Sequence, residues 1–391
     1  MMLKSKMSQS MLLACWVLLC FSTSMVFSAE TKLLTSVGLR QEYNDNILYN
    51  RSDEIDDFIS KVIPSLRLNH DTELLKLSAL ASWSGWLFWD NSDLNRLNQR
   101  YGLNGNYRIA ERWSISASGR YVLDSTQDSQ LDETGSVELG LKDRERLNAG
   151  AGLDYAVSER STIGSDYNYQ KTDFERKSSV DTELHSFRFF YRHRLQNERD
   201  VITIFPRFVW GDTDDWDAYN SSLNFRWAHP FSETLDMSLT VGARHSRVDY
   251  NDDRDDTDNW GGVADMWLRK RGELTTGRLG FSNRLRTRTN GEIVNVSRLY
   301  TNIDHRLSRR FGIGFRGSIY FSQLIEDSPE NDDDRWYFDV RPSAFYQLTE
   351  NHSLRLLYSY SQEKSLDRDS DRKRNRQRIW LQLTFNFPKT W

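Results

Sequence analysis

The chain is poor in cysteine and in long apolar runs. Only two of its 391 residues are cysteines, Cys15 and Cys20, and both lie among the first thirty positions. Beyond those positions no apolar stretch approaches the roughly 18 residues that a membrane-spanning helix requires. The remainder of the chain therefore uses no disulfide, cysteine nucleophile or cysteine metal site, and any membrane insertion must rely on strands.

A basic excess is also lacking. The whole chain carries 52 Lys and Arg against 56 Asp and Glu, a formal net charge of −4. This balance argues against a nucleic-acid partner, which would call for a basic surface. Aromatic residues, in contrast, reach 13% in a chain of otherwise polar composition.

Residues 1–29 have the layout of a secretory signal peptide. Lys4 and Lys6 precede an apolar segment at 11–21, and small residues follow up to Ser28 and Ala29. A basic start, an apolar middle and small residues at the cleavage point are what signal peptidase recognises. Cleavage after Ser28 and cleavage after Ala29 both remain open. The sequence thus predicts a signal peptide at 1–29 and a mature domain at 30–391.

Polar and apolar residues alternate through most of the mature chain. In residues 113–121, for example, Trp113, Ile115 and Tyr121 occupy odd positions, while Ser114 and Arg120 occupy even ones. A period of two is typical of strands that bury one face. It predicts eighteen strands near 31–43, 57–68, 74–89, 97–109, 113–124, 147–157, 161–173, 183–195, 201–211, 217–228, 234–246, 259–269, 274–287, 294–307, 311–323, 335–348, 352–362 and 376–387.

The connections alternate between tight polar turns and long acidic loops. "SER" at 158–160 represents the first kind, and "NDNILYNRSDEIDD" at 44–57 the second. Segment 125–146 is interpreted as one long loop, since no second tight turn interrupts it. An even strand count, strands of about ten residues and sorted connections indicate a transmembrane antiparallel up-and-down β-barrel in the outer membrane of a Gram-negative bacterium. A soluble β-sandwich or propeller would not sort its connections in this way.

Aromatic residues gather at two levels of the predicted strands, as the interfacial girdles of a barrel do. The level beside the tight turns comprises Tyr107, Trp113, Tyr155, Trp227, Trp267, Phe311 and Tyr346. The level beside the long loops comprises Tyr43, Trp89, Tyr121, Tyr169, Trp210, Tyr219, Trp336 and Tyr360. The apolar face therefore contacts lipid, and the polar face of each strand lines a lumen. The chain ends in "LTFNFPKTW", in which "PKTW" is expected to extend beyond the last strand.

The predicted lumen is rich in arginine, although the mature chain is acidic. The candidate path-lining residues are Arg100, Arg108, Arg120, Arg188, Arg207, Arg226, Arg244, Arg278, Arg284, Arg298, Arg316, Arg341, Trp86, Tyr300 and Tyr320. Guanidinium groups favour anions and can bind carboxylates with two hydrogen bonds, and aromatic faces can support a sugar. The alternative is purely structural, with arginines pairing to acids of neighbouring strands. No catalytic, metal-binding or cofactor-binding set is predicted, because the seven histidines are scattered.

Two short segments resemble a known family. The first strand and loop, "SVGLRQEYNDNILYN" with Tyr43, Asn44, Asp45 and Asn46, resemble the opening of β-barrel porin proteins encoded with exopolysaccharide and exosortase gene clusters. Residues 153–174 resemble the same family's strand, Ser/Thr-Glu-Arg turn and Tyr-rich strand. The resemblance implies an outer-membrane barrel that exports an exopolysaccharide, and it transfers no individual binding residue.

Three functions remain open at this point. The first is a pore that exports an acidic exopolysaccharide in concert with periplasmic export proteins. The second is a general or anion-preferring porin for small solutes, and the third is a plugged structural or adhesion barrel. Expected partners are outer-membrane lipid, lipopolysaccharide and the β-barrel insertion machinery, besides the polysaccharide itself.

Residues 30–391 produced without detergent should aggregate, because about half of each strand would expose apolar side chains to water. Gel filtration together with circular dichroism checks this expectation. A well-folded soluble monomer would contradict the barrel.

Overall fold

The structure is a computed structural model that describes residues 30–125, 141–175, 179–251, 256–288, 292–325, 334–366 and 373–391. The predicted signal peptide at 1–29 lies outside the described residues, as does most of the predicted loop at 125–146. No helix in the described ranges is long and apolar enough to cross a membrane.

The described residues form eighteen strands and one short helical turn. The strands are β1 (Glu30–Asn44), β2 (Asp57–Asp71), β3 (Leu75–Phe88), β4 (Arg96–Ala110), β5 (Trp113–Ser125), β6 (Asp143–Ala156), β7 (Ser161–Phe174), β8 (Thr182–Arg194), β9 (Val201–Asp212), β10 (Trp216–Pro230), β11 (Leu235–Tyr250), β12 (Thr257–Arg271), β13 (Thr275–Thr287), β14 (Ile293–Arg306), β15 (Phe311–Leu324), β16 (Arg335–Gln347), β17 (His352–Ser365) and β18 (Lys373–Thr390), and the 3₁₀ turn η1 spans Ser92–Leu94. This confirms the predicted barrel and its strand count.

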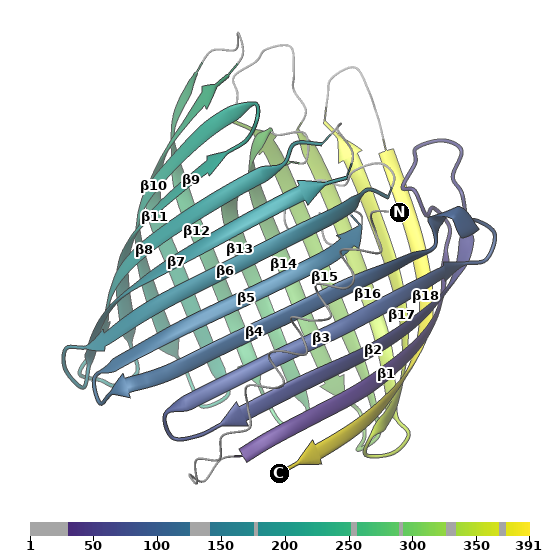
Figure 1. Ribbon diagram of the computed structural model, residues 1–391, viewed down its shortest axis with the longest axis horizontal. Helices are drawn as coiled ribbons and strands as arrows, with labels where there is room; N and C mark the ends of the chain where they lie inside the picture. Colours follow the sequence, from purple (N-terminus) through teal and green to yellow (C-terminus); the bar gives the residue numbers. More distant parts are fainter. Residues whose placement is uncertain are drawn as a thin grey trace, which may run out of the picture.

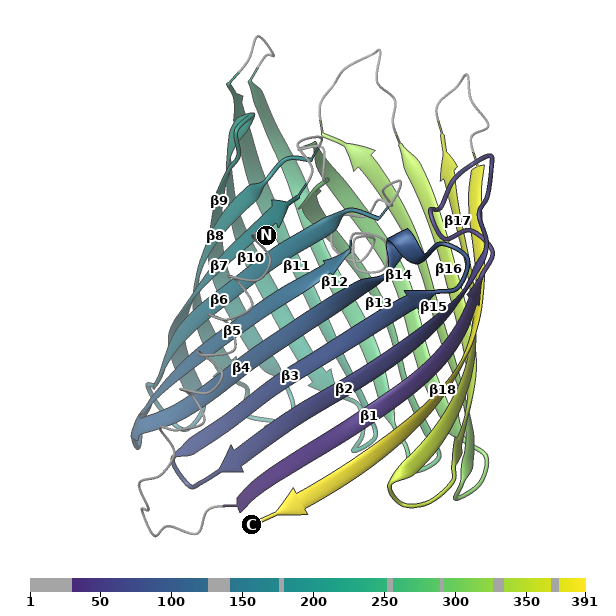
Figure 2. The ribbon, with the colours of Figure 1, turned by 45° about the vertical axis from the view of Figure 1, so that its right-hand side comes forward.

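The sheet closes on itself. Each strand pairs with its sequence neighbours, and β1 also pairs with β18, antiparallel throughout. Figures 1 and 2 show β1 and β18 side by side, and both the start of β1 and the end of β18 lie at the end of the barrel that carries the short turns. A closed sheet leaves no edge, so every strand can satisfy its backbone groups within lipid.

The last strand is longer than the sequence predicts. The pairing of β18 with β1 continues to Thr390, which lies opposite Lys32. The expectation that "PKTW" extends beyond the strand was therefore wrong, since only Trp391 follows β18. Pro388 is tolerated although it lacks an N–H, and it lies opposite Leu34.

Strand β6 also begins earlier than expected. The sequence assigns 125–146 to a loop, but β6 starts at Asp143, so Arg144 and Arg146 belong to the barrel wall. Both are buried and donate to Asp124 of β5, with Arg146 Nη2 at 2.6 Å from Asp124 Oδ2. The sequence does not predict the start of this strand because all four residues of "DRER" are charged, so polar and apolar residues do not alternate there.

The two faces of the strands differ in chemistry. In β4 the side chains of Leu97, Leu103 and Ile109 are exposed on one face, whereas Asn104 and Arg108 lie on the other. The same division recurs around the barrel, and exposed apolar and aromatic side chains occupy the outer face. An apolar exterior on a closed antiparallel barrel is the arrangement of outer-membrane proteins.

One residue of the predicted girdles lies on the opposite face. Trp267 follows the inward register of β12 and lies beneath the guanidinium of Arg278, 4.8 Å from its ring centroid. Its neighbours Met266 and Leu268 face outward, so alternation within the strand already placed Trp267 in the lumen. Its assignment to the outer girdle was wrong.

The barrel core is formed partly by a loop. Residues 45–56 connect β1 to β2, and the first half of this loop is buried inside the barrel. Ile47 and Tyr49 are 2% and 0% exposed. We call residues 45–50 the inner strap. The sequence predicted an acidic external loop here, and the buried positions of Ile47 and Tyr49 correct that expectation.

A charge placed on the outer face should destabilise the barrel. Leu103→Arg puts a guanidinium near the middle of β4 against hydrocarbon, which costs about 2–4 kcal/mol. Urea unfolding from lipid vesicles measures the loss. Asn104→Arg is the matched control on the inner face and should leave the unfolding free energy nearly unchanged, so equal losses in the two variants would count against the assigned faces.

Candidate functional site: the arginine-lined lumen

All fifteen candidate residues follow the inward register of their strands. Five of them line one open cavity of about 800 Å³, namely Arg188, Arg207, Arg226, Arg244 and Arg284. Arg100, Arg108, Arg120, Arg278 and Arg316 lie exposed on the same inner face. The remaining five, Trp86, Arg298, Tyr300, Tyr320 and Arg341, are more enclosed among other side chains.

The open cavity lies along one arc of the barrel. Its lining residues come from β4 through β14, from Asn104 to Ile293. Most of them belong to the inward-facing positions of their strands. A solute in this cavity would meet the inward-facing side chains of these strands directly.

A lateral row of arginines crosses this arc. Strand register places Arg188 opposite Arg207, and places both Arg207 and Arg244 opposite Ser222 of the strand between them. Gly261 of β12 lies opposite Arg244. A Cβ atom at Gly261 would lie 2.8 Å from Nη2 of Arg244, so the glycine provides the space for that guanidinium.

Two arginines of the cavity are neutralised by acids. Nη2 of Arg188 lies 2.5 Å from Oδ2 of Asp166, and Nη2 of Arg284 lies 2.7 Å from Oδ2 of Asp265. At Arg188 and Arg284 these ion pairs support the alternative in which lumenal arginines pair with acids of neighbouring strands and stabilise the wall. They also orient the guanidinium groups within the wall.

Three other arginines, Arg207, Arg226 and Arg244, make no ion pair in the described part of the chain. Nε of Arg207 donates to Oγ of Ser186 at 2.9 Å, and Nε of Arg226 donates to Oγ1 of Thr240 at 3.1 Å. Hydroxyl groups hold these side chains in place without cancelling their charge. Arg244 is 8% exposed and makes no ion pair with the residues described. The cavity therefore keeps a net positive wall.

Aromatic rings support several of these guanidinium groups. The ring of Phe205 lies 5.2 Å from the Arg226 guanidinium and 5.8 Å from that of Arg188. Phe190 lies beneath Arg188 and Arg192, at 5.6 and 5.0 Å. Stacking on a ring fixes the plane of a guanidinium and leaves its N–H groups directed to the lumen.

The opposite arc of the lumen is filled. Tyr320 lies beneath the guanidinium of Arg298, and Nε of Arg341 lies 2.7 Å from Oδ2 of Asp339. Lys61, 2% exposed, donates to Glu42 at 2.7 Å and lies 3.4 Å from the centroid of Trp86. Trp86, Arg298, Tyr320 and Arg341 therefore contact other side chains of the wall and are less open to the lumen.

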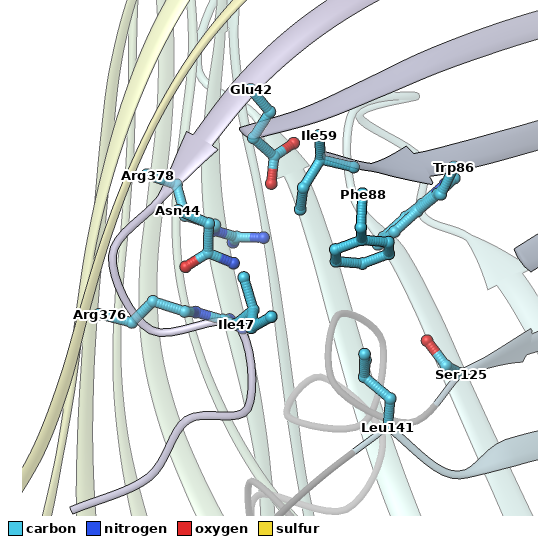
Figure 3. Close-up of a pocket in the computed structure, with 10 residues that line it drawn as sticks. All are labelled: Glu42, Asn44, Ile47, Ile59, Trp86, Phe88, Ser125, Leu141, Arg376 and Arg378. Atoms are coloured by element: carbon cyan, nitrogen blue, oxygen red, sulfur yellow. The ribbon is translucent and has the colours of Figure 1, made fainter. Parts of the chain in front are cut away.

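The inner strap packs against this filled arc. Figure 3 shows Ile47 and Asn44 facing Phe88 and Trp86 of β3, with Arg376 and Arg378 of β18 beside them. Sequence reasoning missed the strap because its loop reads as acidic. The available signal was the apolar group Ile47, Leu48 and Tyr49 within that loop.

No protein-family profile matches the chain, and no curated protein is similar to it in sequence. Among solved structures, Pseudomonas aeruginosa OccK2 (OpdF) in complex with glucuronate is 12% identical with a TM-score of 0.51, covering 93% of this chain and 100% of that one. The fold is that of an outer-membrane porin.

Two further solved structures have similar coverage. Pseudomonas aeruginosa OpdK with vanillate is 10% identical with a TM-score of 0.49, over 93% of this chain and 99% of that one. Acinetobacter baumannii OccAB3 is 9% identical with a TM-score of 0.47, over 91% and 99%. The likeness to OccK2 (OpdF) shows the fold alone and says nothing about the function of this chain.

Within the described ranges, no group of three or more His, Cys, Asp or Glu side chains is arranged to hold a metal ion. The described lumen offers positive charge and hydrogen-bond donors.

Neutralising one wall acid should strengthen any preference of the lumen for anions. Asp166→Asn removes a negative charge and releases Arg188 to the cavity. The reversal potential in a salt gradient across a planar bilayer should shift toward anion permeability. Asp173→Asn is the matched control, because Asp173 lies on the outer face of the same strand and is paired with Lys171. An equal shift in both variants would contradict the lumenal placement.

Proposed function

We propose that the chain is an anion-preferring outer-membrane porin for small solutes. The observation that carries this proposal is the positive wall formed by Arg207, Arg226 and Arg244, which line an open cavity and make no ion pair with the described residues. Fixed cations along a pore attract anions and repel cations, so they raise the local anion concentration. Passage would be passive and driven by the solute's own gradient.

Carboxylates fit this wall best among anions. Arg207 and Arg244 flank Ser222, so a carboxylate between them could accept hydrogen bonds from two guanidinium groups and a hydroxyl. Planar guanidinium groups bind carboxylates through two parallel hydrogen bonds. The glucuronate bound to OccK2 belongs to that protein, and here it only illustrates a carboxylated solute of suitable size.

Export of an acidic exopolysaccharide is the less supported candidate. It depends on short segments such as "SVGLRQEYNDNILYN", whereas the comparisons extend to porin barrels only. The inner strap lies within the lumen, where an exported polymer would have to pass. Small solutes need only the open arc lined by β4 through β14, and for this reason we prefer the porin.

The route of assembly is part of the same proposal. Residues 1–29 would direct secretion and be removed, and the insertion machinery would recognise the final strand β18. The outer face would then contact lipid, and its upper rim lipopolysaccharide. The position of the first residue of the mature protein would distinguish cleavage after Ser28 from cleavage after Ala29.

The triple variant Arg207→Gln, Arg226→Gln, Arg244→Gln tests the proposal. Anion over cation permeability should fall by about three-fold, because the fixed charge of the wall is removed while side-chain length is kept. Single-channel recordings in a potassium chloride gradient measure the ratio.

A matched triple control is Arg112→Gln, Arg247→Gln, Arg310→Gln. Arg112 and Arg310 lie in turns at the rim, and Arg247 is paired with Asp249 on the outer face. The control should keep the original permeability ratio. An unchanged ratio in the lumenal triple variant would refute anion selection by these residues.

A further inference from the structure

The inner strap contacts two groups of strands on the inner wall of the barrel. Ile47 packs with Ile59 of β2 and Phe88 of β3. Tyr49, two residues later, packs with Val294 and Val296 of β14, Tyr320 of β15 and Tyr337 of β16. The strap therefore lies inside the barrel, along the arc of wall that runs from β14 through β18 and β1 to β3.

Hydrogen bonds hold the strap at its base. The Asn46 side chain donates to the carbonyl oxygens of Asn50, at 2.8 Å, and Asn375, at 3.1 Å. Its own Oδ1 accepts from the N–H of Asn50 at 2.8 Å. Gln377 N–H donates to the Asp45 carboxylate at 2.7 Å, so β18 fixes the position at which the strap leaves the wall.

Tyr49 has two unfavourable features besides its close packing, a strained backbone and an unpaired buried hydroxyl. It has a φ of 57°, a left-handed conformation that bulky side chains rarely adopt. Its hydroxyl is buried with no hydrogen-bond partner among the described residues. Arg376 lies over its ring at 5.0 Å. Backbone strain and an unpaired hydroxyl persist only where the surroundings impose them, and they concentrate at functional positions.

The open cavity and the strap occupy complementary arcs. The cavity is lined from β4 to β14, and the strap contacts β14 to β16, β18, β2 and β3. We propose that the inner strap sets the upper size of the solutes that pass, and that the buried side chain of Tyr49 anchors the strap in this position. The inference rests on the proposed pore but is independent of its charge preference.

The strap can be removed without altering a strand. β1 and β2 remain paired up to Asn44 and Asp57, directly at the two ends of loop 45–56. Replacing residues 45–56 by Asn-Gly closes these strands with a two-residue hairpin turn. Tyr49→Gly is the finer variant, because glycine accepts the positive φ and only the ring is lost.

The test combines conductance in planar bilayers with swelling of vesicles by uncharged sugars of increasing size. Uncharged sugars report size alone, so a failure of anion preference would appear only in the reversal potential. Both variants should conduct about two-fold more and admit larger sugars, because the open cross-section increases. Ile55→Gly, in the exposed half of the same loop, is the matched control and should change neither measurement.

A heat-dependent shift in gel mobility identifies folded barrels, and the hairpin variant carries the test if Tyr49→Gly does not fold. A closed unmodified chain that opens in the hairpin variant would also support the strap as the limit. Conductance and sugar size that stay the same in the folded hairpin variant would overturn the inference.

Discussion

The structure depends on the need of each backbone N–H and C=O group for a partner where water is absent. Hydrocarbon offers no hydrogen bond, so a sheet in lipid must close, and here the pairing of β1 with β18 closes it. Closure then fixes which side chains face outward, since successive residues in a strand point to opposite faces. The arginine-rich lumen is a consequence of this single constraint, because the polar half of each strand has no other place to lie.

The same alternation explains why the fold was accessible from the sequence. Lipid on one face and water on the other impose a period of two that needs no knowledge of the neighbouring strands. Predicted boundaries such as 161–173 for Ser161–Phe174 therefore agree closely with the structure. The start of β6 was not predicted because Arg144 and Arg146 face inward beside charged neighbours, so the two faces of the strand do not differ in hydrophobicity there. The face of Trp267 was predicted wrongly because its position near a tight turn suggested the outer girdle, whereas the alternation along β12 places it inside.

The candidate site was only partly accessible. Parity placed Arg207 and Arg244 on the inner face, but a sequence does not give the register between strands. Their shared neighbour Ser222 and the space above Gly261 depend on that register. Which arginines are paired, as Arg188 is with Asp166, likewise depends on contacts between residues distant in the chain. The inner strap depends on tertiary packing of a loop, for which strand periodicity carries no information.

The strap also separates the closure of the barrel, which depends on the strands, from the width of the lumen, which depends on the loop. Its ends meet at Asn44 and Asp57, where the strands are already paired, so the barrel does not rely on it for continuity. Twelve residues could therefore be exchanged as a cassette between barrels of this kind. A lineage could acquire a new permeation range through changes in a single loop, while the sequence that inserts into the membrane stays as it is.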